Sequence, residues 1–305
     1  MKSTRKAYGE FLCENGKLNN DIVVFDADLA KATCTNEFAN MYSNRHFDIG
    51  ISEQDMVGTA CGMALTGKKV FASTFAMFLA GRAYEQVRNT AAYSHININL
   101  CATHSGLGVG EDGPTHQCIE DIALMNVIPG MKIFCPADDI STKKILNECL
   151  KLDGPKYIRL GRNEAPFIYS DNDIFETGKS NTFGNGKDGT IFACGSTLSI
   201  ALDAKKELES EGLFVRVVDL YSIKPVDKEE IIKSAKETTT LISIEDHSVI
   251  GGIGSIISNI LCEYYPKKLI KLGVQDKFGK SGKVIELYKM YGITKEEIVN
   301  KIKGK

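Results

Sequence analysis

The sequence predicts an α/β protein made of two doubly wound domains. Short apolar runs typical of buried strands alternate with amphipathic stretches typical of helices, a pattern that favours parallel sheets covered on both faces. The length of 305 residues suits two domains of ordinary size. Between Arg162 and Asp188 the chain turns polar and loses any helical period. We therefore predict a first domain over residues 1–170, a linker over 171–187 and a second domain over 188–305.

The first half opens with an amphipathic helix and then alternates strands with helices. The apolar spacing predicts helices at Thr4–Asn15, Glu53–Thr66, Gly81–Ser94 and Ser141–Leu150. Runs of apolar residues predict strands at Ile22–Asp26, Val70–Thr74, Ile96–Cys101 and Lys132–Cys135. This alternation is typical of a parallel sheet, because each crossover between parallel strands needs a helix.

The second half repeats the same alternation after the polar stretch. We predict strands at Thr190–Cys194, Phe214–Asp219 and Thr240–Glu245. Helices are expected at Ser199–Glu211, Asp227–Ala235, Gly254–Tyr264 and Val284–Tyr291.

Composition excludes several classes of function. The chain is 43% apolar and 25% charged, as in ordinary globular proteins, and its net charge of -2 gives no sign of a nucleic-acid partner. No apolar run approaches the roughly 20 residues of a membrane span, and the first residues lack the apolar core of a signal peptide. Nine cysteines are scattered without a C-x-x-C pair, which argues against a disulfide framework or a zinc site. We expect a cytoplasmic protein with reduced thiols.

One segment stands out for its polar groups. Residues 102–117, here called the histidine loop, hold His104 and His116, the adjacent acids Glu111 and Asp112, and several glycines. Glycine at that density is unfavourable in a helix, so the segment reads as a loop after the predicted strand Ile96–Cys101. The whole chain has only 5 histidines, so two in one loop point to function. Loops at the ends of parallel strands commonly carry catalytic groups.

Three further features are ambiguous when taken singly. Glu53 lies at a strand-to-helix junction, where an acid also stabilises the helix start. Phe75 and Phe78 follow a strand three residues apart, which fits either core packing or a pocket for a flat heterocycle. Arg5 and Arg162 are candidate anion binders, because the guanidinium fork suits phosphate.

Two nucleotide motifs are only partly present and are rejected. The run Gly251-Gly252-Ile253-Gly254 lacks the third glycine of the dinucleotide fingerprint. The run Gly279-Lys280-Ser281 looks like the end of a P-loop, but Val274 occupies the position of its first glycine.

Taken together, the motifs resemble those of transketolase, in order and over nearly the whole chain. The histidine loop is the most specific of them, and the others are Ser3–Gly9, Phe47–Gln54, Ser73–Phe78, Pro136–Asp138, Tyr157–Arg162, Ile223–Pro225 and Glu245–Gly254. The resemblance implies a thiamine-diphosphate pyrimidine-binding domain followed by a transketolase C-terminal domain. The Gly-Asp-Gly…Asn signature of the domain that holds the diphosphate and its metal is not found.

The resemblance assigns cofactor contacts in the first domain. Glu53 corresponds to the glutamate that bonds N1′ of the aminopyrimidine and so supports acid–base activation of the cofactor. Phe75 and Phe78 correspond to the aromatic wall of the pyrimidine pocket. A third pocket aromatic is missing, because Gly81 and Arg82 occupy that stretch.

The resemblance also assigns sugar contacts. His104 and His116 correspond to histidines that contact the carbonyl and hydroxyls of the sugar and donate to the oxygen that gains charge. Asp112 corresponds to the aspartate that reads the C2 hydroxyl. Arg5 and Arg162 correspond to the arginines that grip the terminal phosphate.

A chain with these two domains alone implies a split enzyme. A separate N-terminal subunit would bind the diphosphate and supply most of the ligands of the Mg²⁺ ion. We therefore expect no metal ligands in this chain. Thiamine sites lie between subunits in this family, so a heterotetramer with two copies of each chain is expected. The complex would transfer a two-carbon ketol unit between ketose and aldose phosphates, and this chain alone would be inactive.

Three alternatives remain open. A 1-deoxyxylulose-5-phosphate synthase has a similar histidine loop, although Arg159, Arg162 and the Ser3–Lys6 run favour transketolase. The β subunit of a 2-oxoacid dehydrogenase shares the layout but is not expected to carry Gly110–His116. A non-catalytic subunit is the third alternative, against which the intact acid and histidine positions argue.

Overall fold

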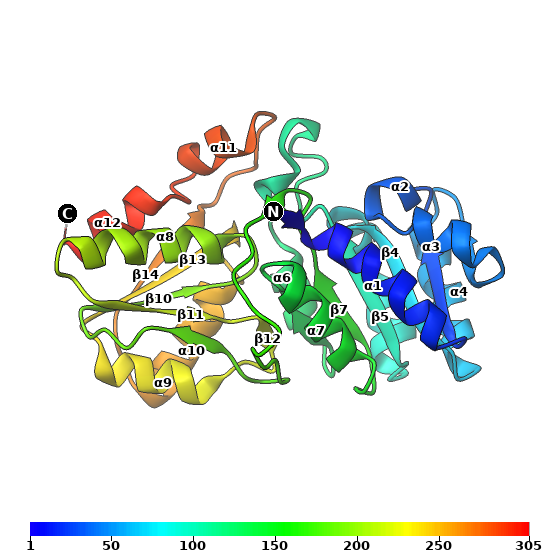
Figure 1. Ribbon diagram of the computed structural model, residues 1–305, viewed down its shortest axis with the longest axis horizontal. Coiled ribbons are helices and arrows are strands. Elements are labelled where there is room, and N and C mark those ends of the chain that lie inside the picture. The colour runs from blue at the N-terminus through cyan, green and yellow to red at the C-terminus, as the bar shows by residue number, and fades with distance from the viewer. Residues whose placement is uncertain (305) are drawn as a thin grey trace.

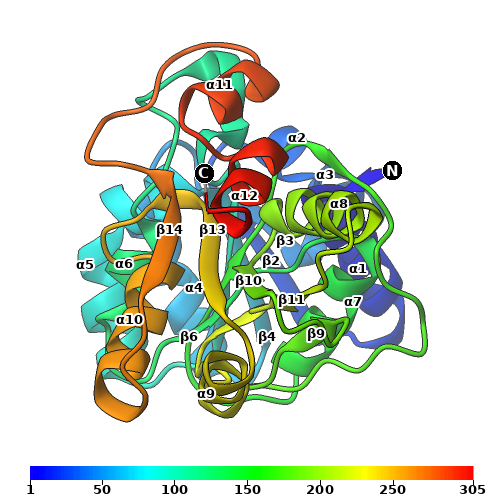
Figure 2. The ribbon, with the colours of Figure 1, turned by 90° about the vertical axis from the view of Figure 1, so that its left-hand side faces the viewer.

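Two mostly parallel sheets organise the chain and lie side by side, each with helices packed on its faces (Figures 1 and 2). The computed structural model describes residues 1–304. The predicted α/β class with two successive doubly wound halves is confirmed. Within the described residues no helix has the length and apolar content that a membrane crossing requires.

The larger sheet has seven strands in the order β12-β6-β7-β5-β4-β2-β3. All neighbours are parallel except β12, which runs antiparallel to β6. Its strands are β2 (Ile22–Asp26), β3 (His46–Asp48), β4 (Lys69–Phe75), β5 (Ile98–Thr103), β6 (Lys132–Phe134), β7 (Lys156–Arg159) and β12 (Ser222–Lys224).

Helical segments follow most strands of this sheet. They are α1 (Thr4–Leu18), α2 (Ala30–Thr33), α3 (Asn36–Met41), α4 (Glu53–Leu65), α5 (Tyr84–Gln86), α6 (Asp121–Asn126) and α7 (Asp139–Cys149). Two 3₁₀-helical segments, η1 (Ser43–Arg45) and η4 (Leu107–Asp112), and two π-helical segments, η2 (Met77–Arg82) and η3 (Val87–Tyr93), complete the described helical structure of this half. The helix predicted from Gly81 is thus an irregular helical run that begins earlier, directly after β4.

The smaller sheet has five strands in the order β14-β13-β10-β11-β9, with β9 antiparallel at one edge. Its strands are β9 (Asn181–Phe183), β10 (Gly189–Ala193), β11 (Val215–Asp219), β13 (Thr240–Ser248) and β14 (Leu269–Val274). Its helices are α8 (Thr197–Ser210), α9 (Lys228–Glu237), α10 (Ile253–Tyr264), α11 (Val284–Met290) and α12 (Lys295–Ile302). A short ribbon of β1 (Lys2–Ser3) and β8 (Glu164–Ala165) lies outside both sheets.

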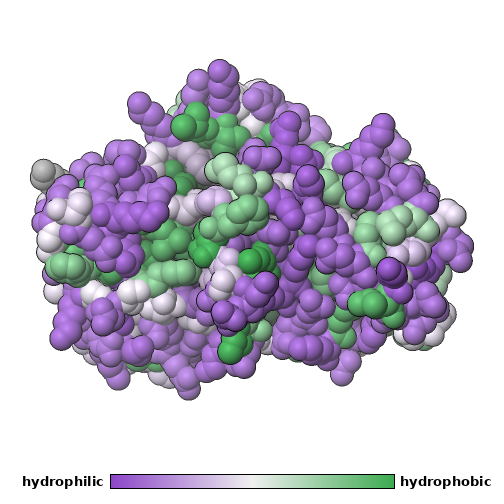
Figure 3. Space-filling view, viewed as in Figure 1, coloured by the Kyte–Doolittle hydropathy of each residue, from purple (hydrophilic) through white to green (hydrophobic). Residues whose placement is uncertain are grey.

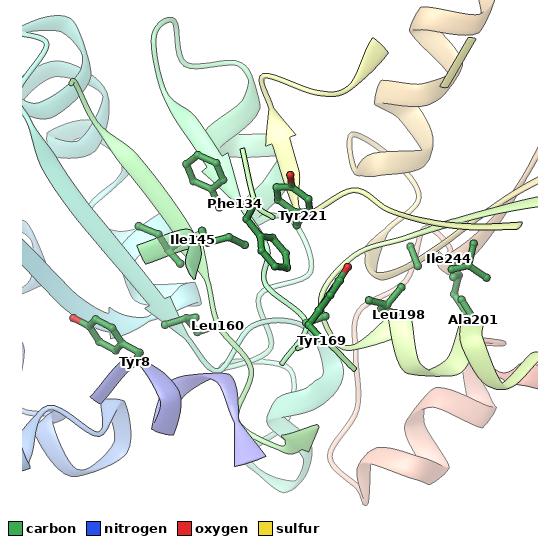
Figure 4. Close-up of a cluster of buried hydrophobic side chains, with 14 of the residues drawn as sticks. Tyr8, Phe134, Ile145, Leu160, Tyr169, Leu198, Ala201, Tyr221 and Ile244 are labelled. Carbon is green, nitrogen blue, oxygen red and sulfur yellow. The ribbon is translucent and has the colours of Figure 1, made fainter. Parts of the chain in front are cut away.

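The two halves share one hydrophobic cluster. It runs from Tyr8 of α1, through Phe134, Tyr169 and Tyr221 at the junction, to Leu198 of α8 (Figure 4). Strand β12 belongs to the chain segment after β11 but pairs with β6 of the larger sheet. On the face in Figure 3 polar residues dominate, while apolar residues gather near the middle, where the sheets meet. The junction is therefore a packed interface rather than a loose hinge.

Candidate active site

The predicted site residues gather where parallel strands of the larger sheet end, which is where open α/β sheets usually bind ligands. Strand β4 ends at Phe75 and β5 ends at Thr103, and the histidine loop continues from β5. Figure 1 shows this loop, coloured teal, at the top of the molecule beside α11. Glu53 begins α4 on the same side of the sheet.

Glu53 is a buried acid with one charged partner. Its side chain is 1% exposed and its Oε2 accepts from Nη1 of Arg82 at 2.7 Å. The amide end of α4 adds a favourable partial positive charge. Arg82 lies at the end of η2, with its guanidinium carbon 4.6 Å from the ring centre of Phe78. One arginine therefore contacts both the buried acid and the neighbouring aromatic ring.

Aromatic rings form the next part of the site. Phe75 and Phe78 lie nearly parallel, with centres 5.8 Å apart and planes 15° apart. Phe75 also stacks on the imidazole of His104 at 3.9 Å, and His116 meets the Phe78 ring edge to face at 5.4 Å. These phenylalanines thus contact the polar groups of the site, instead of packing only within the core.

His104 is held neutral. Burial, reinforced by the charges of Arg5, Arg162 and His116, lowers its pKa from 6.5 to about 3. Its Nε2 lies 3.4 Å from Nη1 of Arg5, which can only donate, and its Nδ1 lies 3.0 Å from the Thr103 hydroxyl. These neighbours assign the proton to Nδ1 and leave Nε2 as an acceptor.

Arg5 and Arg162 form the far end of the site. Nε of Arg5 donates to the carbonyl of Arg162 at 3.2 Å, and its Nη1 donates to the carbonyl of Ala32 at 2.7 Å. Arg162 donates to the carbonyl of Val109 and lies 3.8 Å from the carboxylate of Asp112. Two guanidinium groups beside an exposed acid make a polar end suited to an anionic, hydroxylated ligand.

The structure links all the predicted site residues in one row of contacts. Glu53 lies at one end and Asp112 at the other, and the complete set is Arg5, Glu53, Phe75, Phe78, His104, Asp112, His116 and Arg162. The row passes from a buried acid, across aromatic rings, to the histidines and then the arginines. Such an order suits a ligand with a flat heterocycle at one end and an anion at the other.

Family models match both halves of the chain. The model described as "Transketolase, pyrimidine binding domain" matches residues 1–167, and "Transketolase, C-terminal domain" matches residues 178–298. The chain belongs to the transketolase family. The resemblance to transketolase seen in the sequence is therefore confirmed.

Several similar proteins are parts of divided transketolases. A protein of Methanocaldococcus jannaschii named as a transketolase C-terminal section is 43% identical over 99% of this chain and 95% of its own length. The 6-deoxy-6-sulfo-D-fructose transketolase subunit of a Clostridium species, strain MSTE9, is 36% identical over 97% of this chain and 92% of its own. The solved structure of a split gene transketolase, described as an inactive β4 tetramer, superposes with a TM-score of 0.92 at 44% identity, over 100% of this chain and 98% of that one.

The residues present fit the pyrimidine half of thiamine diphosphate, the cofactor on which transketolases depend. An aminopyrimidine needs a carboxylate at a ring nitrogen and apolar faces for its ring, and Glu53 with Phe75 and Phe78 offers both. Residues 1–304 contain no cluster of three or more His, Cys, Asp or Glu side chains that could hold a metal ion.

Two features of the candidate site were missed in the sequence. Arg82 was noted only as a departure from the aromatic pattern, and nothing indicated that it would pair with Glu53. Asp246 of β13 was seen only as part of a motif, yet its carboxylate accepts from the backbone of Leu107 at 2.8 Å. A contact between residues so far apart in the chain has no local sequence signal.

Proposed function

We propose that this chain is the pyrimidine- and sugar-binding subunit of a thiamine-diphosphate-dependent transketolase. The complex would move a two-carbon ketol unit from a ketose phosphate to an aldose phosphate. The row of contacts from Glu53 to Arg162 carries the proposal, because a buried acid and aromatic rings suited to a pyrimidine are followed by histidines and arginines suited to a sugar phosphate. The family membership and the divided relatives support it.

Each part of the row has a separate task in this proposal. When bound, thiamine diphosphate would supply the carbon nucleophile of the reaction. Glu53 bonds the pyrimidine ring, and Phe75 and Phe78 hold its faces. His104 and His116 orient the sugar and donate an N–H to its oxygen as that oxygen gains charge. Arg5 would turn from Nε2 of His104 to the phosphate, and His104 would take the tautomer with its proton on Nε2, while its Nδ1 accepts from the Thr103 hydroxyl.

A separate subunit would bind the diphosphate and Mg²⁺. The names of the similar C-terminal section, subunit and split-gene structure support this division of labour. We expect two copies of each chain per complex, because the cofactor would then lie at each contact between unlike subunits. Light scattering of the reconstituted complex measures this directly, and a stable complex with another ratio contradicts it.

Reconstitution tests the activity. The chain mixed with a candidate diphosphate-binding subunit, thiamine diphosphate and Mg²⁺ should convert xylulose 5-phosphate plus ribose 5-phosphate, and the chain alone should not. Glu53→Gln should lower kcat at least 100-fold, because the carboxylate is lost at the pyrimidine. Asp55→Asn is the matched control, since Asp55 lies exposed on the same helix and should leave activity unchanged.

Two results would redirect the proposal. Use of pyruvate as donor would indicate a 1-deoxyxylulose-5-phosphate synthase, and release of carbon dioxide from a 2-oxoacid would indicate a dehydrogenase β subunit. Full activity of Glu53→Gln would support a non-catalytic role. Because one relative is named for a 6-deoxy-6-sulfo sugar, a sulfonate sugar belongs in the donor panel.

A further inference from the structure

The histidine loop has a backbone that something must hold in place. His104 adopts φ of 55°, and Gly106, Gly110 and Gly113 also have positive φ. Left-handed backbone is unfavourable for a residue with a side chain and persists where surrounding contacts enforce it. His104 is also one of the proposed sugar contacts, so the contacts that fix this backbone bear on the site.

The contacts at the start of the loop come from the smaller sheet. Asp246, at the end of β13, is buried, and its Oδ1 accepts from the amide of Leu107 at 2.8 Å. Its Oδ2 accepts from the amide of Gly108 at 3.2 Å and from the hydroxyl of Tyr288 in α11 at 2.8 Å. A side chain at Gly106 would collide with the same carboxylate. The loop thus fits closely around one acid of the other half.

A buried arginine fixes Asp246 from the opposite side. Nη2 of Arg159 donates to the backbone carbonyl of Asp246 at 2.8 Å, while its Nε pairs with Asp121 at 2.8 Å. All three side chains are less than 5% exposed. A buried charge-assisted network of this kind is rigid because every member is paired.

The other side of the loop meets the segment before α11, residues 279–282, here called the strap. The Ser281 hydroxyl donates to the carbonyl of Glu111 at 2.5 Å, and Nε2 of Gln117 donates to the carbonyl of Lys280 at 2.9 Å. Gly279 packs against Gln117 so closely that a side chain there would collide with it. The strap therefore holds the part of the loop that carries Asp112 and His116.

We propose that the C-terminal half sets the shape of the sugar site, with Asp246 and Ser281 as positioning residues for the histidine loop. Neither residue belongs to the row of candidate ligand contacts, so each acts through the loop backbone. The link to sugar binding rests on the proposed function, whereas the control of loop shape does not. An asparagine at 246 would keep the shape of the side chain but set an NH₂ group against donors that need an acceptor.

Hydrogen–deuterium exchange on the chain alone tests the control of loop shape. In Asp246→Asn the peptides covering 104–117 should exchange at least tenfold faster, with strands β10 and β11 unchanged. Tyr288→Phe is the matched control, because both loop amides keep their acceptor, and its loop should exchange within about threefold of the parent. Ser281→Ala is the milder second variant, since Ser281 is exposed, and it should speed exchange over 110–117. Ser199→Ala removes a hydroxyl of α8 that donates to the carbonyl of Ser196, away from the loop, and it should change nothing.

The reconstituted complex tests the link to the sugar. Asp246→Asn and Ser281→Ala should raise KM for the ketose phosphate about tenfold and threefold respectively, with the Kd of thiamine diphosphate within twofold of the parent. Unchanged loop exchange in folded Asp246→Asn and in Ser281→Ala would overturn the proposal. Faster exchange with an unchanged KM would overturn its link to the sugar. A parent complex that turns over no sugar refutes the proposed function instead, and the exchange result still decides the loop.

Discussion

Arg82 brings a positive charge to the buried acid of the candidate site. It holds Oε2 of Glu53, while Oε1 makes no hydrogen bond to any residue of the chain from 1 to 304. The carboxylate thus has one fixed oxygen and one free oxygen. Under the proposed function, the free oxygen is the one available to a pyrimidine nitrogen.

Removing the arginine charge should leave a buried acid without a partner. Arg82→Met should lower the free energy of unfolding by about 1–2 kcal/mol at pH 7, a modest value because Arg82 is 46% exposed. Urea denaturation of the parent and the variant at pH 7 measures this loss.

Two variants make that result specific. In Arg82→Met combined with Glu53→Gln, the loss should be smaller than in Arg82→Met alone, because no unpaired charge is then left buried at position 53. Arg88→Met removes an exposed arginine of η3 that bonds only a neighbouring asparagine, and it should cost less than 0.5 kcal/mol. An equal loss in Arg88→Met, or an equal loss in Arg82→Met with and without Glu53→Gln, would contradict the ion-pair explanation.

His104 should make the fold sensitive to acid. Its pKa of about 3 in the folded state lies below the ordinary 6.5, so the unfolded chain binds a proton first as the pH falls. The free energy of unfolding should therefore drop between pH 6.5 and pH 3, by about 1–2 kcal/mol from pH 7 to pH 5. His104→Asn, which cannot titrate, should lack this part of the drop. Parallel denaturation curves at both pH values provide the check, and identical pH dependence would contradict the buried neutral histidine.

At the scale of elements, the histidine loop joins the end of β5 to the other half of the molecule. Gly106→Ala should destabilise the protein by more than 2 kcal/mol, because positive φ and a collision with Asp246 act together. Gly67→Ala is the matched control, since Gly67 has φ of 89° but open space around it, and about 1 kcal/mol is expected. Thermal unfolding of both variants measures the difference. Equal losses of unfolding free energy in the two variants would show that backbone strain, and not the collision with Asp246, causes the destabilisation.

Local patterns in the sequence predicted most of these elements, and their failures have physical causes. The long buried strands and the amphipathic helices can be recognised in the sequence from the spacing of their apolar residues. Strand β7 does not, because Lys156 and Arg159 lie within it and are buried through paired contacts. Strand β9 falls in the stretch predicted as linker, where its few half-exposed residues carry no apolar pattern.

The candidate site also has one part that local sequence patterns predicted and one part that they did not. Glu53, the phenylalanines and the histidine loop belong to motifs that lie within short stretches of chain, so their types and spacing could be recognised. The pairing of Arg82 with Glu53 and the grip of Asp246 on the loop depend on how helices and sheets pack. No local pattern encodes such contacts, because they join segments that only the folded chain brings together.

At the scale of the whole molecule, the shared core predicts joint unfolding. Tyr221 and Phe175 meet at 4.8 Å at the junction, within the cluster that also includes Tyr8 and Leu198. We expect one transition in urea, with circular dichroism and exchange of both sheets giving the same midpoint. Tyr221→Ala should lower that midpoint for both sheets alike. A sheet that melts separately would contradict a common core.

The pairing of β12 with β6 bears on how this protein can be re-engineered. A chimaera that exchanges everything after the linker would replace one edge strand of the first sheet together with the acid that grips the histidine loop. Grafts between relatives should therefore carry residues 222–224, Asp246 and the strap from the same parent as the larger sheet, or else replace both halves. The boundary of such a graft should therefore be chosen from the contacts between the two halves, and not from the position of the linker in the sequence.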